Sequence, residues 1–476
     1  MLTLNKFYID GAWVDPASDA TMPIMNPATA SQIGTVSMGN SEDVDRAVAA
    51  AKRAFETFSM TTKAERLALL ENLRVATIDR LGDLAAAMTS EMGAPATMSL
   101  DVQAQSGLGH LDDFIAALKN LDDEEVLPNG DIISREPIGV CGLITPWNWP
   151  INQIALKVVP ALATGATCVL KPSEHTPISA QIYAEIVEAA GYPAGVFNLV
   201  QGDGISVGSA MSRHPDIAMM SFTGSTRAGT AVSKDAADGV KRVTLELGGK
   251  SPNLVFADAD LNKRVTESVQ GCFYNTGQSC NAPTRLLVER SCYDEVLEIA
   301  KAAGEAQAVG DPAQQGDHIG PVFDKIQYDR VQAMIKIGID EGARVLVGGL
   351  GKPEGLETGW YVKPTIFCDV DHDMRISREE IFGPVLVITP FDSEEDAIKM
   401  ANDTDYGLAA YIQSSDEARV SRVVRRLRAG TIQINGRGPD YGSPFGGYKQ
   451  SGNGREGGVF GLEDYLEIKV RPPFTA

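Results

Sequence analysis

The segment IGVCGLITPWN, residues 138–148, joins a short apolar run to a polar turn. Further apolar runs of strand length follow, and helical patterns such as the one at 178–190 separate some of them. These runs cover residues 167–170, 196–200, 217–222 and 243–247. Short apolar runs that alternate with helices are typical of a parallel sheet covered on both faces. We therefore predict an α/β fold.

Polar or glycine-rich clusters directly follow four of these runs. They are Thr145 to Asn148, Lys171 to Glu174, Thr223 to Ser225, and the pair Gly248 and Gly249. In an open α/β sheet, ligands bind beyond the carboxyl ends of the strands. We therefore expect the four clusters to converge on one rim of the sheet, which is the predicted ligand site.

The segments on either side of this region also carry secondary-structure signals. Helical spacing predicts a helix over 41–58 with Ser41 as its N-cap. Thr62 and Glu65 form a capping box for a second helix, which we expect to end near Gly93. Further along, residues 253–434 are long enough for a second domain. Its strand-like runs cover residues 285–288, 344–347 and 385–388.

Two short segments outside these regions carry strand signals. Asn129 and Gly130 form a strong hairpin-turn signal inside residues 122–137, and residues 465–470 are a candidate terminal strand. An isolated hairpin of this size is only marginally stable in water. We therefore expect it to join a larger sheet or a neighbouring subunit.

Composition excludes several classes of protein. A chain of 476 residues with 43% apolar residues can form two or three domains with large cores, which excludes disorder. The net charge of -21 opposes a nucleic-acid partner, because binding to phosphate backbones needs clustered Lys and Arg. Neither a signal peptide nor an apolar run of about 20 residues is evident. We expect a soluble, cytoplasmic protein without a membrane partner.

The cysteines and histidines do not form a metal-binding pattern. The chain has six cysteines and five histidines, and no Cys-x-x-Cys or close Cys/His set occurs among them. We therefore expect no metal and no chemistry driven by histidine.

Three residues have surroundings that suit covalent catalysis. Cys280 lies in the polar stretch NTGQSCN, residues 275–281, and is either a packing thiol or an activated nucleophile. Glu246 ends an apolar run, so its carboxylate is either paired or has the raised pKa that suits a general base. Asn148 is either a turn residue or a donor to a developing oxyanion.

Other residues at the expected rim could bind an anionic cofactor. Residues 224–229 follow a strand and could open a helix whose N–H groups hold a phosphate, but their spacing is not G-x-G-x-x-G and a structural turn is the alternative. Lys171 is either a ligand of phosphate or ribose oxygens or a solvated lysine. Glu174 is either a partner for ribose hydroxyls or a carboxylate near an N-cap.

Five motifs share their order and spacing with one known family. They are PWNWP at 146–150, FTGST at 222–226, ELGGKSP at 246–252, GQSC at 277–280 and EIFGP at 380–384. Over essentially its whole length the chain resembles the NAD(P)-dependent aldehyde dehydrogenase superfamily. The resemblance implies Cys280 as nucleophile, Glu246 as general base, and Asn148 as oxyanion donor together with the Cys280 backbone N–H.

The resemblance also implies NAD as the cofactor, with NADP possible. Lys171 and Glu174 would hold the adenine ribose, and Glu174 favours NAD because a carboxylate repels a 2'-phosphate. Gly224 and Ser225 would face the pyrophosphate. The full predicted cofactor set is Ile144, Thr145, Pro146, Trp147, Lys171, Ser173, Glu174, Gly204, Phe222, Gly224, Ser225, Leu247, Glu380 and Phe382. Of these, Glu380 would hold the nicotinamide ribose and Phe382 would pack beside the ring.

Family architecture implies three parts. Residues 1–120 and 138–248 would form a Rossmann-type dinucleotide-binding domain, and 249–445 an α/β catalytic domain. Residues 121–137 and 461–476 would form a small β oligomerisation element. Family members assemble as dimers or tetramers, so a homodimer or homotetramer is expected.

The substrate implied is a small-molecule aldehyde. NGR at 435–437 and YKQSGNGRE at 448–456 resemble a branch that acts on aliphatic aldehydes and ω-oxo acids. The predicted substrate tunnel comprises Trp149, Gln153, Tyr274, Ser279, Arg437 and Phe445. Arg437 is either the ligand of a substrate carboxylate, through a bidentate contact, or a solvated loop residue.

Two alternatives to this function follow from the same scaffold. An acylating dehydrogenase would pass its acyl group to coenzyme A, but relatives of that kind lack the water-activating glutamate, and Glu246 is present. A catalytically silent binding or structural protein would tend to lose the nucleophile or the base. Cys280, Glu246 and Asn148 are all present, which favours an active enzyme.

Overall fold

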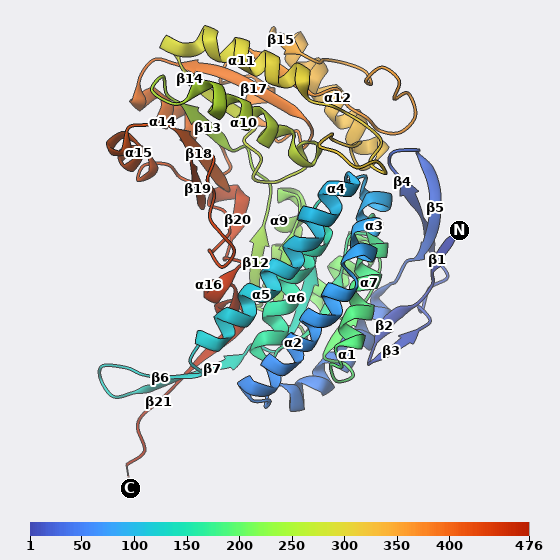
Figure 1. Ribbon diagram of the computed structural model, residues 1–476. Coiled ribbons are helices and arrows are strands. Elements are labelled where there is room, and N and C mark those ends of the chain that lie inside the picture. The colour runs from blue at the N-terminus through green and yellow to red at the C-terminus, as the bar shows by residue number, and fades with distance from the viewer. Residues whose placement is uncertain (476) are drawn as a thin grey trace.

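Five parallel strands form the centre of an eight-stranded sheet in the computed structural model, which describes residues 1–475 (Figure 1). The strands are β8 (Val140–Ile144), β9 (Thr167–Lys171), β10 (Phe197–Leu199), β11 (Met219–Thr223) and β12 (Arg242–Glu246). Their spatial order is β12-β11-β8-β9-β10. The chain thus moves outward from β8 to β10 and then returns to the other side of β8, so the strand order reverses between β8 and β11. The predicted α/β fold is confirmed.

Three short strands complete the edges of this sheet. They are β2 (Phe7–Ile9), β3 (Ala12–Val14) and β20 (Gly452–Asn453), and they pair antiparallel with their neighbours. Because β20 comes from the far end of the sequence and pairs with β12, it carries the C-terminal part of the chain to the carboxyl end of that strand.

Helices cover both faces of the sheet. One face carries α2 (Lys63–Asp79), α3 (Leu81–Met92), α5 (Gln105–Asn120), α6 (Pro150–Thr164) and α7 (Pro177–Ala189). The other carries α1 (Ser41–Phe58), α8 (Ser209–Arg213) and α9 (Thr226–Ala237). Within β8, Cys141 and Leu143 pack into the first core, whereas Val140 and Ile144 pack into the second. This alternation explains why the strands are apolar throughout.

Two local predictions in the N-terminal helices are wrong. The N-cap of α1 is Asn40 and not Ser41, because the Asn40 side chain accepts from the N–H groups of Glu42 and Asp43. The helix expected from Thr62 to Gly93 is two helices, broken at Arg80, whose φ of -113° and ψ of 7° are not helical. The predicted capping box and the end at Gly93 are both present.

A second sheet has seven strands in the order β15-β16-β17-β14-β13-β18-β19. The strands are β13 (Pro252–Val255), β14 (Arg285–Glu289), β15 (Arg344–Val347), β16 (Thr365–Cys368), β17 (Val385–Phe391), β18 (Ala409–Gln413) and β19 (Thr431–Ile434). Its helices are α10 (Leu261–Phe273), α11 (Tyr293–Ala306), α12 (Lys325–Asp340), α13 (Arg375–Arg378), α14 (Glu394–Asn402) and α15 (Glu417–Val424). The three strand-like runs predicted in this region correspond to β14, β15 and β17.

Two three-stranded sheets lie outside the main layers. The first comprises β1 (Leu2–Leu4), β4 (Thr21–Asn26) and β5 (Ser31–Ser37). The second comprises β6 (Glu124–Val126), β7 (Ile132–Pro137) and β21 (Leu466–Arg471), and it projects from the body as an arm (Figure 1). It contains the predicted hairpin and the predicted terminal strand. Ala476, the last residue assigned to this element from the sequence, lies outside the described residues.

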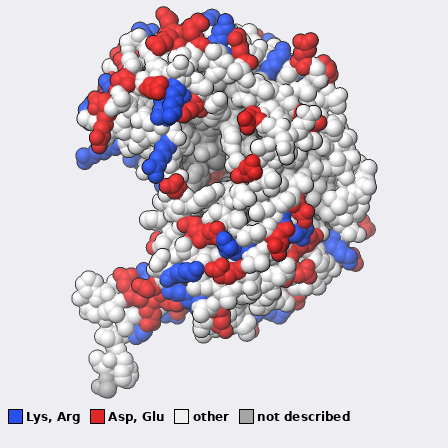
Figure 2. All heavy atoms as spheres, in the orientation of Figure 1, with Lys and Arg blue, Asp and Glu red and all other residues white. Residues whose placement is uncertain are grey.

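Short helical segments make up the remaining elements. They are α4 (Ala96–Met98), η1 (Ser99–Ala104), η2 (Gly204–Gly208), η3 (Tyr274–Gly277), η4 (Arg290–Cys292), η5 (Lys449–Ser451) and α16 (Gly458–Glu463). Among the described residues, none of the helices is long and apolar enough to cross a membrane. Figure 2 shows acidic and basic side chains interspersed over one face of the molecule.

Candidate active site

The carboxyl ends of four parallel strands meet at one rim of the first sheet. Ile144, the last residue of β8, is paired with Lys171 of β9 on one side and with Phe222 of β11 on the other. Thr223 of β11 is paired with Glu246 of β12. The register therefore brings together the polar clusters that follow these strands, as expected from the sequence.

A cavity of about 220 Å³, here called the inner cavity, opens at this rim. The predicted residues that line it are Pro146, Trp147, Asn148, Gln153, Gly224, Ser225, Leu247, Cys280, Glu380 and Phe382. Thr223, Gly248, Phe323, Gln327 and Arg330 also line it. The cavity is thus lined by the strand ends of the first sheet and by loops and α12 from the second half of the chain.

A second cavity of about 440 Å³, here called the outer cavity, shares Cys280 and Gln153 with the inner one. Its walls come from α5, α6 and the loop after β19, and they include His110, Trp149 and Tyr441. Cys280 therefore lies where two cavities meet. The inner cavity lies along the carboxyl ends of the strands of the first sheet. The outer cavity extends from Cys280 toward α5 and the loop after β19.

The Cys280 thiol lies in a strongly acidic setting. Burial raises its pKa, and the negative charges of Glu246 and Glu380 raise it further. The backbone N–H groups of Cys280 and Asn281 oppose this effect by hydrogen bonding to the sulfur. The thiol is thus protonated at neutral pH in the protein alone, and it needs a base or a nearby positive charge to become a thiolate.

Three consecutive residues before Cys280 have left-handed backbone conformations. Asn275, Thr276 and Gly277 have φ values of 53°, 58° and 71°. The Asn275 side chain supports the first of these, because its Nδ2 donates to Asn148 O at 3.0 Å and its Oδ1 accepts from Gln103 at 3.0 Å. The strained segment is therefore held by the buried polar groups around it.

Asn148 points at the same loop. Its side chain is buried, and its Nδ2 donates to Gln278 O at 2.9 Å. Because Asn275 in turn holds the Asn148 carbonyl, the amide has a fixed position beside the residues that precede Cys280. Asn148 Nδ2 has a second hydrogen, which can donate to the oxyanion that forms when Cys280 adds to a carbonyl.

Glu246 ends β12 with a buried and unpartnered carboxylate. The residue is 2% exposed, and neither of its oxygens accepts a hydrogen bond from a described residue. Burial raises its pKa well above the usual range, and the charge of Glu456 raises it further, whereas Lys157 and Arg455 lower it. A buried carboxylate with these properties is a strong candidate for a general base.

Reasoning from the sequence missed the ion pair beside Glu246. Lys157 of α6 is fully buried and pairs with Glu456, which is 299 residues away in the sequence. Lys157 also donates to Ser221 of β11 at 3.1 Å. The apolar helical pattern around Lys157 does not predict this ion pair. The pair forms because β20, which precedes Glu456 in the sequence, pairs with β12 of the first sheet.

The chemistry of the inner cavity fits a dinucleotide. Glu380 is half-buried and accepts from Gly249 N at 2.9 Å, and partial removal of its carboxylate from water raises its pKa. The Trp147 and Phe382 rings both line the cavity and lie edge to face, with centroids 5.5 Å apart. Phe323, missed from the sequence, stacks on Trp147 at 3.7 Å. A carboxylate for ribose hydroxyls and flat apolar walls for a ring are thus side by side.

The remaining predicted cofactor residues lie around the rim without lining this cavity. They are Ile144, Thr145, Lys171, Ser173, Glu174, Gly204 and Phe222. Lys171 is buried and donates to Glu174 Oε2 at 3.2 Å. The α9 N-terminus is capped by Ser225, whose Oγ accepts from Ala228 N at 3.3 Å.

The structure separates one predicted tunnel residue from the rest. Trp149, Gln153 and Phe445 line the outer cavity, and Tyr274 and Ser279 line an adjoining one. The Arg437 side chain is 82% exposed, lies 3.5 Å from Asp440, and lines neither cavity.

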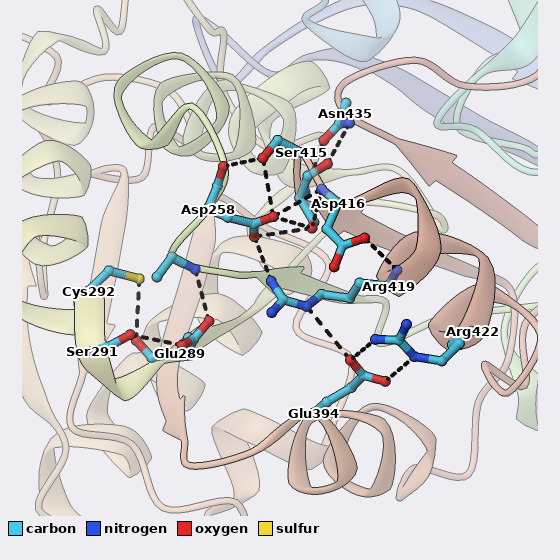
Figure 3. Close-up of polar contacts among 12 residues, drawn as sticks. Asp258, Glu289, Ser291, Cys292, Glu394, Ser415, Asp416, Arg419, Arg422 and Asn435 are labelled. Atoms are coloured by element: carbon cyan, nitrogen blue, oxygen red, sulfur yellow. Dashed lines mark hydrogen bonds and ion pairs between the residues drawn. The ribbon is translucent and has the colours of Figure 1, made fainter.

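The loop that carries Arg437 is anchored at its start. Asn435 Oδ1 accepts from Ser414 N at 3.1 Å, and its Nδ2 donates to Ser414 O at 2.9 Å. Ser414 and Ser415 donate to Asp258, which also accepts from Arg419 (Figure 3). This network fixes the point from which residues 438–445 extend along the outer cavity.

The strand order of the first sheet and a half-buried thiol at the meeting of two cavities are typical of a nucleotide-dependent enzyme that works through a covalent intermediate. Comparisons with known proteins agree. The model of the aldehyde dehydrogenase family matches residues 13–471. The chain belongs to the aldehyde dehydrogenase family, as predicted from its sequence motifs.

Individual relatives are similar over nearly their whole length. The chain is 51% identical to the 3-succinoylsemialdehyde-pyridine dehydrogenase of a Pseudomonas species, over 99% of this chain and 98% of the relative. An aldehyde dehydrogenase from Bartonella henselae superposes with a TM-score of 0.98 at 49% identity, covering 99% of both chains. A mutant of aldehyde dehydrogenase C from Pseudomonas syringae, solved with NAD+ and octanal, gives 0.96 at 48% identity, covering 98% of this chain and 96% of that one.

Proposed function

We propose that the protein oxidises an aldehyde to the carboxylic acid, with NAD as the preferred hydride acceptor and NADP as a possible one. The observation that carries this proposal is the position of Cys280, which lies in both the inner and the outer cavity. A cofactor in the inner cavity and an aldehyde in the outer cavity would both reach its sulfur. Solved relatives that contain NAD+ support this choice of cofactor.

The first half-reaction forms a thioester on Cys280. The thiol loses its proton to solvent water, and the resulting thiolate attacks the aldehyde carbon, so a C–S bond forms, the C=O π bond breaks and the carbonyl oxygen becomes an oxyanion. Asn148 Nδ2 and the Cys280 backbone N–H donate to this oxyanion, and each such donor contributes about 3 kcal/mol. A nicotinamide held in the inner cavity beside Glu380 and Phe382 would supply the acceptor for the hydride that leaves the carbon as the oxyanion collapses. The carbon of the adduct is thereby oxidised to the thioester.

Hydrolysis of the thioester then requires a base. Glu246 takes a proton from a water molecule, whose oxygen attacks the thioester carbon and releases the acid and the thiolate. The raised pKa of Glu246 makes its ionised form a stronger base than an exposed carboxylate.

The same proposal divides the chain as its sequence suggested. Residues 1–120 and 138–248 bind the cofactor, residues 249–445 carry the nucleophile, and residues 121–137 and 461–476 join copies of the chain into a homodimer or homotetramer. The substrate is an aliphatic aldehyde or a semialdehyde, and the relative named for a semialdehyde and the one solved with octanal support these two classes. Arg437 does not support an ω-oxo acid as substrate, because its side chain faces solvent and lies 3.5 Å from Asp440.

Two variants test the mechanism. Cys280→Ala abolishes aldehyde-dependent NADH formation while NAD binding, followed by fluorescence quenching, survives. Glu246→Gln gives one burst of NADH per active site and then stops, because the thioester accumulates. Continued turnover by Cys280→Ala would contradict the proposal. A requirement of the wild type for coenzyme A would favour the acylating alternative, and no turnover of any aldehyde would favour a silent protein.

A further inference from the structure

A third cavity adjoins the predicted substrate site. It measures about 530 Å³ and is here called the side chamber, with Arg264, Glu267, Gly271, Tyr411, Gln413 and Gln433 among its lining residues. It shares Trp149, Asn281 and Gln433 with the outer cavity. The side chamber lies beside the nucleophile loop, because Ser279 and Asn281, the neighbours of Cys280, also line it.

The outer cavity and the side chamber meet along a border that hydrogen bonds hold in place. Trp149 lines both of them, and its indole N–H donates to Ser279 Oγ at 2.9 Å. The Tyr411 hydroxyl donates to Asn281 O at 2.7 Å and holds the other side of the nucleophile. An aldehyde bound at Cys280 therefore lies at a fixed border between the two cavities, and on the far side of Trp149 the side chamber has the volume of an ordinary ligand pocket.

The side chamber is rich in hydrogen-bonding groups. Gln413 is 3% exposed, and its Oε1 is buried without a hydrogen-bond partner among the described residues. Gln433 Nε2 makes one long contact of 3.4 Å, to the Tyr411 hydroxyl. Arg264 donates to Glu267 at 2.8 Å, which uses only part of the five N–H groups of a guanidinium.

The charged side chains of this lining leave a net negative charge. Among the described residues that line the outer cavity and the side chamber, Arg264 is the single lysine or arginine, and Glu267 pairs with it. Asp440 of the outer cavity adds a further negative charge. A substrate carboxylate would approach two carboxylates and an arginine that is already paired. An uncharged oxygen acceptor meets free donors without that repulsion.

We propose that the side chamber binds the far end of an extended aldehyde substrate, and that this end is an uncharged hydrogen-bond acceptor such as a ketone or amide carbonyl held by Arg264 and Gln433. This inference rests on the proposed oxidation of aldehydes at Cys280 and specifies its substrate class. It places specificity on α10 and β19 and not on the exposed Arg437.

The first test compares kcat/KM for three kinds of aldehyde of equal length. They are keto-aldehydes with the ketone moved along the chain, the unsubstituted alkyl aldehyde, and the ω-oxo carboxylate. The wild type prefers the best keto-aldehyde over the alkyl aldehyde by about 10-fold, since the lost contact is a hydrogen bond to a charged group. Arg264→Met combined with Glu267→Gln, which leaves neither charge unpaired, brings this ratio close to one.

The second test fills the side chamber without removing a polar group. Gly271 lies in α10, and a Cβ there would meet only Pro283 Cγ, at 3.7 Å. Gly271→Leu therefore places a side chain in the chamber and improves helix propensity. It lowers kcat/KM for the keto-aldehyde at least about 10-fold relative to that for propanal, by blocking a chamber of ordinary ligand size. Gly82→Leu, in α3 with open space at its Cβ, is the matched control and leaves the ratio unchanged.

Three results would overturn the inference. They are a keto preference that survives in the Arg264 and Glu267 variant, a wild type that prefers the ω-oxo carboxylate, and a Gly271→Leu ratio equal to that of the control. A wild type that oxidises simple aldehydes but shows no keto preference refutes this inference alone. A wild type that forms no NADH from any aldehyde refutes the proposed function as well.

Discussion

At the scale of single residues, Glu246 shows which properties of a site residue can be predicted from the sequence and which cannot. Its place after an apolar run predicted a buried carboxylate, and the structure confirms that burial. The charges that set its pKa could not be predicted, since Glu456 and Lys157 reach it from distant parts of the chain. The local sequence pattern predicts which residues are buried. It does not predict which charged residues lie beside them, because these come from distant parts of the chain.

The arginines show the same limit. The sequence marked Arg437 as a possible ligand of the substrate because of its motif, but the structure exposes it. Arg264 lies in a helix of ordinary amphipathic pattern, and the structure turns it into the side chamber. Which arginine faces a cavity depends on the path of a loop and the rotation of a helix, which spacing alone does not determine.

The environment of Glu246 predicts a shift in pH dependence. Glu456→Gln removes a negative charge and leaves the buried Lys157 ammonium free to act on Glu246, and both changes lower the pKa of Glu246. Because the base must be ionised, the rise of the thioester hydrolysis rate with pH then begins at lower pH than in the wild type. Single-turnover measurements of acid release between pH 5 and pH 9 give this pH dependence of thioester hydrolysis. Glu463→Gln, at an exposed position, is the control. If the hydrolysis rate of Glu456→Gln rises at the same pH as in the wild type, or at a higher pH, Glu246 is not the base.

At the scale of elements, the strands were predicted more accurately than the helix ends. An apolar run such as residues 138–144 has few alternatives once it is buried on both faces, and β8 occupies most of it. The break at Arg80 left no trace in the sequence, because helical periodicity continues across it. At the break, Arg80 pairs locally with Asp83 and, across to α7, with Glu185.

The backbone conformation of the loop that carries Cys280 leads to a second prediction, which concerns Gly277. Gly277 has a φ of 71°, and a Cβ there would lie 2.1 Å from Gly383 O. Gly277→Ala must therefore move the loop that carries Cys280 away from the segment at 383–384. A displacement of about 1 Å at a catalytic group costs about 100-fold in rate, so we expect kcat/KM to fall by about that factor.

A melting curve and the same assay on Gly82→Ala separate this effect from general damage. Gly82 lies in α3, and a Cβ at this position meets no other atom within 4 Å, so alanine is tolerated. Wild-type activity in Gly277→Ala would show that the close approach to residue 383 does not position the nucleophile.

At the scale of the whole molecule, the projecting arm is the feature that a single chain leaves unexplained. Val126, Ile468 and Val470 are 69%, 56% and 58% exposed, although they lie on its strands. Ile468 and Val470 are two residues apart on β21 and so share one face, where Val470 is paired with Ile133 of β7. A small sheet with one apolar face is marginal in water unless another surface covers that face.

The arm therefore predicts self-association. The wild type sediments at two or four times its chain mass of 50.8 kDa. Ile468→Asp combined with Val470→Asp places two charges on the apolar face and reduces the mass to that of one chain, because burying an unpaired carboxylate costs several kcal/mol. Lys469→Gln, whose side chain points to the opposite face of the same strand, keeps the oligomer and serves as the matched control. A double variant that retains the wild-type mass at micromolar concentration would place the interface elsewhere on the molecule.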